Sequence, residues 1–113
     1  MAWLVSADRV LATAEVADGW KARAQGVLGR ESLDGVLVLD PAKAVHTVGV
    51  KFPLDVAFCR RTDDGALRII AIVGMVPNRI GLPRVSAHVV IEAERGAFER
   101  WGVGEGDVVE LRS

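Results

Sequence analysis

The sequence has little cysteine, no excess of either charge and no long hydrophobic run, and each shortage excludes a class of protein. Its single cysteine, Cys59, has no partner for an internal disulfide, so nothing in the chain requires an oxidising compartment. The apolar run at residues 1–5 stops at Ser6, which makes it too short for a secretory signal or a membrane span. We therefore expect a soluble cytoplasmic protein without a membrane partner.

Basic charge is too sparse to attract nucleic acid. The chain has 14 Lys and Arg residues against 15 Asp and Glu residues, which gives a formal net charge of -1. The densest basic pair, Arg60-Arg61, is followed at once by Asp63-Asp64, which cancels most of its field. Counterion release needs a concentrated basic patch. We therefore expect no nucleic-acid partner.

Metal ligands are also few. A zinc site needs three or four of them, whereas the chain offers His46, His88 and Cys59 with no CxxC or HxxxH spacing. The Gly102-x-Gly104-x-Gly106 run precedes a predicted strand, whereas a phosphate loop follows a strand and opens a helix. We expect neither a metal nor a cofactor.

What the chain does contain is enough apolar sequence for one packed core. Of its 113 residues 50% are hydrophobic and 26% are charged, which is typical of a globular domain. Glycine and proline divide the sequence into short segments, and no repeat or long linker separates them. We therefore predict a single domain over residues 1–113.

The first part of the chain predicts two strands around a short helix. Alternating residues at 10–16 are typical of a half-buried strand, and residues 35–39 of a buried strand that ends at Asp40-Pro41. Asp18 can cap the helix between them. The apolar stripe predicted for this helix consists of Trp20, Ala24, Val27 and Leu28.

The second part predicts a hairpin, a loop, a strand, a helical turn and a closing strand. The hairpin joins residues 54–60 to residues 67–76, and because both faces of its second strand are apolar we expect that strand to be central. The remaining segments are a loop at 76–83, a strand at 85–93, a helical turn that buries Ala97, Phe98 and Trp101 and ends at Gly102, and a strand at 108–111. This order favours an α+β fold, mostly antiparallel β, forming a compact sandwich or barrel-like sheet with two short helices.

Several motifs in the right order resemble the prokaryotic family called domain of unknown function number 192. They are Gln25-Gly26-Val27-Leu28-Gly29-Arg30, the segment from His46 to Phe58, and Val90-Ile91-Glu92 with Gly96 and the turn at 102–107. The first resembles the family's Gly-Leu-Met-x-Arg motif, and the second its central motif, which ends in Pro-(Leu/Ile)-Asp-(Val/Ile)-x-Phe. Val27, Leu28 and Val50 depart from residues common in the family, which alters pocket shape before it alters the fold. The resemblance implies one small, mostly β domain and brings no reaction or cofactor.

Polar residues interrupt the apolar segment from His46 to Phe58. If the face of Asp55 is buried, its carboxylate needs a partner, which backbone amides, Lys51 or Arg30 can supply, and we favour such an architectural role. His46 can act as a general base because imidazole suits proton transfer at neutral pH, but a strand histidine more often hydrogen-bonds a neighbour.

Two functions are compatible with these residues. We favour a non-catalytic binding or accessory module for a small molecule or a protein, with a groove beside 46–55 and the Pro77-Asn78-Arg79 loop. The alternative is a small hydrolase-like enzyme with His46 as base, Asp55 as orienting group and Lys51 or Arg79 as anion stabiliser. The candidate binding residues are His46, Lys51, Asp55, Arg79 and Arg30. The sequence leaves the oligomeric state open.

Overall fold

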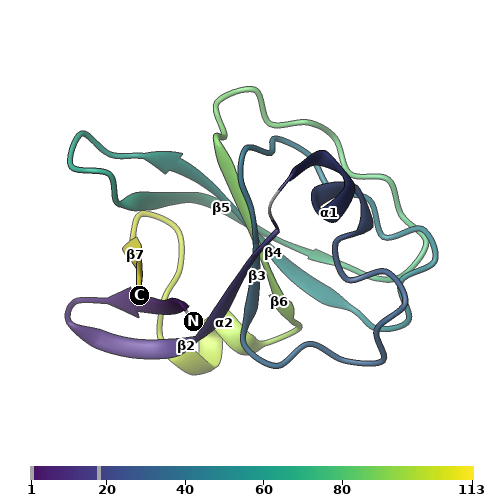
Figure 1. The fold of residues 1–113 in the computed structure, drawn as a ribbon, viewed down its shortest axis with the longest axis horizontal. Coiled ribbons are helices and arrows are strands. Elements are labelled where there is room, and N and C mark those ends of the chain that lie inside the picture. The colour runs from purple at the N-terminus through teal and green to yellow at the C-terminus, as the bar shows by residue number, and fades with distance from the viewer. Residues whose placement is uncertain (1, 18) are drawn as a thin grey trace.

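Strands of the chain close into a barrel in the order β1-β2-β3-β6-β4-β5-β7 (Figure 1). The computed structural model describes residues 2–17 and 19–113. The strands are β1 (Ala2–Ser6), β2 (Arg9–Ala17), β3 (Val36–Leu39), β4 (Leu54–Arg61), β5 (Leu67–Met75), β6 (Val89–Glu94) and β7 (Val108–Arg112). Two short helices, α1 (Gly19–Gln25) and α2 (Ala97–Trp101), complete the fold. The predicted α+β, barrel-like class is confirmed.

Apolar residues fill both faces of the sheet formed by β3, β6 and β4. Alternate residues such as Val38, Ile91 and Ala57 point into the barrel, where Phe98 of α2 is also buried. The intervening residues of the same strands form a second cluster, which packs against Val27, Leu33, Val45 and Val50 from the loops outside the barrel. Burial on both faces explains why these strands read as continuous hydrophobic runs.

The pairing of β2 with β3 is parallel, whereas the other strand pairs are antiparallel. A parallel pair needs a crossover, and here α1 and residues 26–35 provide it on the outside of the sheet (Figure 1). Gly35 allows β3 to approach β2, since a Cβ at this position would lie 2.3 Å from the carbonyl oxygen of Thr13. Its φ of +76° also favours glycine.

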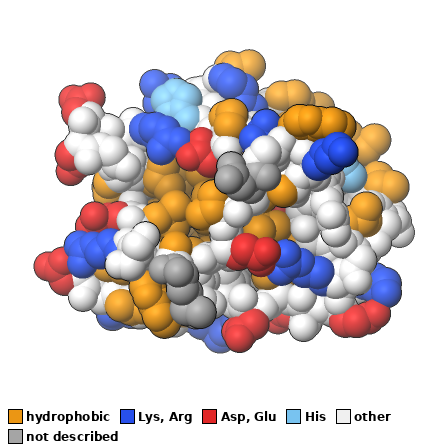
Figure 2. Space-filling model, viewed as in Figure 1, with side chains coloured by type: hydrophobic (Ala, Val, Ile, Leu, Met, Phe, Trp, Pro, Cys, Tyr) orange, Lys and Arg blue, Asp and Glu red, His pale blue; other side chains and the backbone are white. Residues whose placement is uncertain are grey.

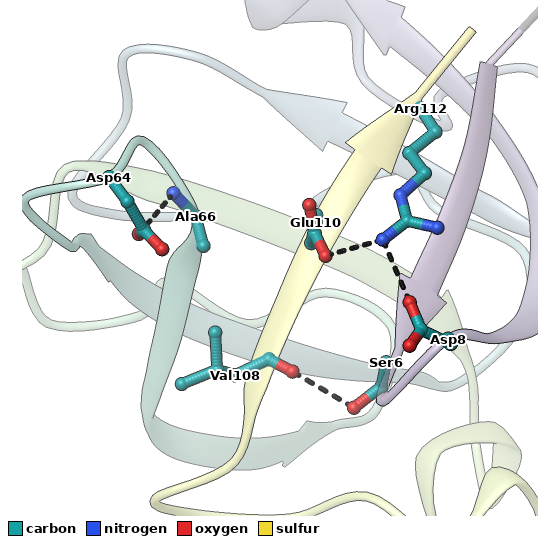
Figure 3. Close-up of polar contacts among 7 residues, drawn as sticks. All are labelled: Ser6, Asp8, Asp64, Ala66, Val108, Glu110 and Arg112. Atoms are coloured by element: carbon teal, nitrogen blue, oxygen red, sulfur yellow. Dashed lines mark hydrogen bonds and ion pairs between the residues drawn. The ribbon is translucent and has the colours of Figure 1, made fainter.

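Side-chain contacts support the closure between β1 and β7 (Figure 3). The Ser6 hydroxyl donates to the carbonyl oxygen of Val108 at 2.9 Å. Arg112 contacts Glu110 at 2.9 Å and Asp8 at 3.2 Å. The same view shows the hairpin turn between β4 and β5, where the Asp64 carboxylate accepts from the Ala66 amide at 3.3 Å.

Three element predictions were wrong in detail. Helix α1 ends at Gln25, so Val27 and Leu28 lie in the following turn, and Trp20 is 70% exposed instead of buried. The predicted cap, Asp18, lies outside the described residues. The strand predicted from residue 85 begins at Val89, because residues 84–88 are held by backbone bonds to other segments, among them the His88 amide to the Cys59 carbonyl.

The expectation that β5 is central holds for only one end of the strand. It pairs with β4 from Leu67 to Met75, but with β7 only at Leu67 and Arg68. Its apolar residues face the two clusters without a second strand beside Ile70–Met75. In the described part of the chain, no helix is long and apolar enough to cross a membrane.

Candidate functional site

A cavity of about 430 Å³ lies between the outer face of the sheet and the segments that cover it. We call it the Glu92 cavity. It is lined by residues 23–28 of α1 and its following turn, by Leu39, Ala42, 44–46, Val50, Ile80 and Gly81, and by Glu92. Most of these side chains are apolar. Parts of all three motif segments, namely Gly26, His46 and Glu92, therefore meet at one place.

Glu92 is the chemically unusual residue of this cavity. On β6 it follows Val90 on the outer face, so the turn after α1 covers it and leaves it 2% exposed. Its Oε1 atom has no hydrogen-bond partner among the described residues. Burial raises the pKa of Glu92 to about 7, although the positive charge of Arg30 lowers it. The carboxyl group is thus poised between its neutral and charged forms near neutral pH.

Gly26 permits the close contact between the turn and this carboxyl group. Gly26 directly follows α1 with a φ of +51°, and a Cβ there would lie 3.2 Å from Oε1 of Glu92. The turn continues through a bond from the Leu28 amide to the Gln25 carbonyl at 2.9 Å. A side chain at position 26 would strain the backbone and crowd Glu92.

Arg30 does not pair directly with Glu92. Its guanidinium instead makes two bonds to the Glu15 carboxylate of β2, at 2.9 and 3.0 Å. These bonds lower the pKa of Glu15 and raise that of Arg30. Arg30 thus influences Glu92 through its charge, and Oε1 of Glu92 is left without a partner in the part of the chain that the structure describes.

His46 lies at the edge of the Glu92 cavity. Its backbone bridges Ile80, which brings the 42–47 segment and the loop after β5 together above the sheet. The histidine is exposed, whereas Glu92 is buried. The cavity therefore has an acid at its base and an imidazole at its mouth.

The other sequence-predicted residues lie elsewhere. The Asp55 carboxylate accepts from the Gly96 amide at 2.7 Å and so fixes the start of α2. The Lys51 ammonium pairs with Glu31 at 2.6 Å on the surface. The Arg79 side chain contacts the Asn78 carbonyl oxygen at 3.2 Å. Of the five predicted residues only His46 lines the Glu92 cavity, and no hydrogen bond joins His46 to Asp55 in the described structure.

Thr47 is the residue that holds the mouth of the cavity in place. It is fully buried, and its hydroxyl donates to the Val76 carbonyl oxygen at 2.6 Å and accepts from the Arg79 amide at 2.9 Å. The Thr47 backbone adds bonds to the Arg79 carbonyl and the Asn78 amide, both at 2.7 Å. These bonds position His46 and Ile80.

Cys59 is fully buried inside the barrel, and burial raises its pKa to about 12, so it stays a thiol at neutral pH. No group of three or more His, Cys, Asp and Glu residues is arranged to hold a metal ion in the described part of the chain.

The fold and the cavity together define a small β-barrel domain with a buried acid beneath its crossover helix. The chain belongs to the DUF192 family, described as "Uncharacterized ACR", whose model matches residues 3–111. The family named from the motifs is confirmed. A search of curated proteins finds no match.

Two solved structures resemble this fold. A protein of unknown function from Novosphingobium aromaticivorans has a TM-score of 0.77 and 23% identity, covering 96% of this chain and 82% of its own. A protein from Sinorhizobium meliloti named as a candidate transcription regulator has a TM-score of 0.74 and 26% identity, covering 98% and 90%. These likenesses support the barrel architecture.

Proposed function

We propose that the chain is a non-catalytic binding module, and that the Glu92 cavity takes a small ligand with an apolar body and a hydrogen-bond donor at its buried end. One observation carries the proposal: a carboxyl oxygen that has no hydrogen-bond partner among the described residues, at the base of a mostly apolar cavity. A buried acceptor that lacks a donor costs about 1–3 kcal/mol, and a ligand that supplies the donor removes this cost.

The size and composition of the cavity support this proposal. A volume of about 430 Å³ falls within the range of small-molecule sites, which are commonly apolar with a few polar groups. The buried Glu92 supplies the polar group that orients a ligand. Burial raises the pKa of Glu92 to about 7, so its carboxyl group can be neutral or charged near neutral pH. An ammonium group of a ligand would favour the charged carboxylate, whereas an amide group of a ligand can donate to either form.

A cytoplasmic location is part of the proposal and rests on the single cysteine, which needs no oxidising compartment. We do not extend the regulatory role named for the Sinorhizobium protein to this chain. The 14 basic residues of this chain are balanced by 15 acidic ones, which argues against a basic surface that would attract nucleic acid.

Three probes with the same six-carbon tail test the proposed function. Hexylamine and hexanamide carry donors, whereas hexanoate at pH 8 carries none. In ¹H–¹⁵N NMR titrations we expect the first two to shift the amides of Gly26, His46 and Gly81, which line the cavity, and hexanoate to leave them in place. Binding of none of the probes, or tighter binding of hexanoate, would contradict the proposal.

Matched variants locate the binding. Ala44 is exposed and lines the cavity, so Ala44→Phe should block the mouth, whereas Ser32→Phe adds the same bulk at an exposed position outside the cavity. Glu92→Leu removes the acceptor and should weaken hexylamine binding about tenfold or more, the loss of a hydrogen bond to a charged group. Equal affinity in Ala44→Phe and Ser32→Phe would place the ligand elsewhere.

A further inference from the structure

The strand β5 has an unpaired edge over much of its length. Beyond its two pairs with β7, its last contact on that side is Ile69, whose amide donates to Asp107 at 2.9 Å and whose carbonyl accepts from Gly106 at 2.8 Å. For Ile70–Met75 the described residues provide backbone partners only on β4. The main-chain groups on the other side of these residues are open to a new strand.

The sequence of this edge lacks charged residues and proline, two common protections against pairing. Exposed edges commonly carry lysine, proline or inward-pointing charges. The segment Ile70-Ala71-Ile72-Val73-Gly74-Met75 has no charge and no proline. A bulge interrupts the register between Ile69 and Ala71, where β7 departs, and the strand runs on regularly from Ala71 to Met75. Such an edge is a template for strand addition.

A groove of about 580 Å³ runs beside the end of this edge. We call it the β5 groove. It is lined by Phe58, residues 73–76 and residues 79–84. Its outer wall is fixed, because the Gly81 amide donates to the Val45 carbonyl at 2.9 Å and the Arg84 amide to the Lys43 carbonyl at 2.8 Å. The groove is therefore preformed.

The wall of the β5 groove combines exposed apolar side chains with positive charge. Ile80 and Leu82 are 82% and 85% exposed. The Arg84 guanidinium lies 5.2 Å from the ring centre of Phe58, Arg79 also lines the groove, and no acidic residue does. Hydrophobic side chains gather along the upper and right margin of Figure 2, where the loop after β5 runs in Figure 1.

We propose that the β5 groove binds an extended peptide segment of a partner protein, rich in apolar and acidic residues, which adds to β5 as a further strand. The open backbone of β5 supplies hydrogen bonds, the apolar groove takes alternate side chains, and Arg79 and Arg84 attract the acids. A second copy of this chain fits less well, because edge-to-edge pairing of two β5 strands brings the arginines of both copies together.

Synthetic hexapeptides test this inference on the full chain. In the first, valine and aspartate alternate, and in its matched control lysine replaces aspartate. We expect the acidic peptide to bind, to shift the amides of Ile70–Met75 in NMR spectra and to slow the hydrogen exchange of those that point away from β4. The basic peptide should bind at least about tenfold more weakly. Arg79→Glu combined with Arg84→Glu, both exposed, should reverse this preference.

Methylated peptides test whether the backbone is the contact. In a strand, the amides of alternate residues point to the same edge, so N-methylation of the valines blocks one edge and N-methylation of the aspartates blocks the other. One of these two peptides should lose binding, and the other should bind like the parent. The inference is wrong if both methylated peptides bind as well as the parent, or if the basic peptide binds as tightly as the acidic one. It is also wrong if no peptide binds and sedimentation shows a dimer that Val73→Lys dissociates.

Discussion

Glu92 is an acidic residue at a buried position of β6, where the preceding residues are apolar. Alternation along 85–93 correctly assigns it to the same face as Val90, but the sequence does not reveal how deeply it is buried. That depth depends on Gly26 and the 42–46 segment, which are distant in the chain and meet only in the fold. The sequence does predict His46 as a candidate binding residue, and His46 lines the Glu92 cavity. Asp55 was also correctly seen as needing a partner, and its partner is the Gly96 amide.

The raised pKa of Glu92 predicts a stability that depends on pH. The folded chain binds a proton that the unfolded chain has released between pH 4.5 and about 7, so the free energy of unfolding should fall across this interval and level off above it. A shift from 4.5 to about 7 corresponds to about 3 kcal/mol.

Urea unfolding of the wild type and Glu92→Gln from pH 5 to pH 8.5 measures this effect. The amide has nearly the same shape and no charge, so the difference in stability should grow in favour of Glu92→Gln as the pH rises. A pH-independent difference between the two proteins would show that Glu92 titrates normally in the folded state.

At the scale of elements, strands were easier to predict than the segments between them. Turn residues at 62–65 and the alternation beside them define the β4–β5 hairpin locally. Helix α1 was less predictable, because its seven residues bury no side chain fully and Trp20 faces solvent. Loop 76–88 has no periodicity, and its conformation comes from bonds to the 42–47 segment, above all those of Thr47.

Thr47→Val should loosen that loop. The substitution keeps the shape of the side chain but leaves the Val76 carbonyl and the Arg79 amide without the hydroxyl, which should lower the free energy of unfolding by about 1–3 kcal/mol. Hydrogen exchange at residues 78–81 should quicken as well. Thr62→Val is the control, since its exposed turn should lose at most about 1 kcal/mol. If both variants lose the same free energy of unfolding, the buried Thr47 hydroxyl stabilises the protein no more than an exposed turn hydroxyl does.

The whole molecule is a barrel whose strands are joined unevenly. β4 and β6 pair over six residues, from Leu54 to Cys59, and nearly all of these residues are buried. β5 and β7 pair over only two. The sequence predicts a barrel-like sheet but not this seam, because pairing between strands distant in the chain is decided by packing that local patterns do not record.

Native-state hydrogen exchange should therefore find the barrel opening first between β5 and β7. Amides at this seam, such as that of Ile69, which donates to Asp107 just before β7, should exchange at a lower opening free energy than those joining β4 to β6, because local opening there exposes less buried surface. Protection of Ile69 equal to that of Ala57 and Ile91 would mean that the barrel opens as one unit.

The pairing of β1 with β7 has a practical consequence. Because Trp3 lies opposite Arg112, both ends of the described chain emerge side by side, on the opposite side of the molecule from α1 (Figure 1). A reporter protein or surface tether attached at either end would leave the cavity mouth and the loop after β5 unobstructed. A short linker between the ends would also permit circular permutation, with new ends placed in the exposed turn at 63–65.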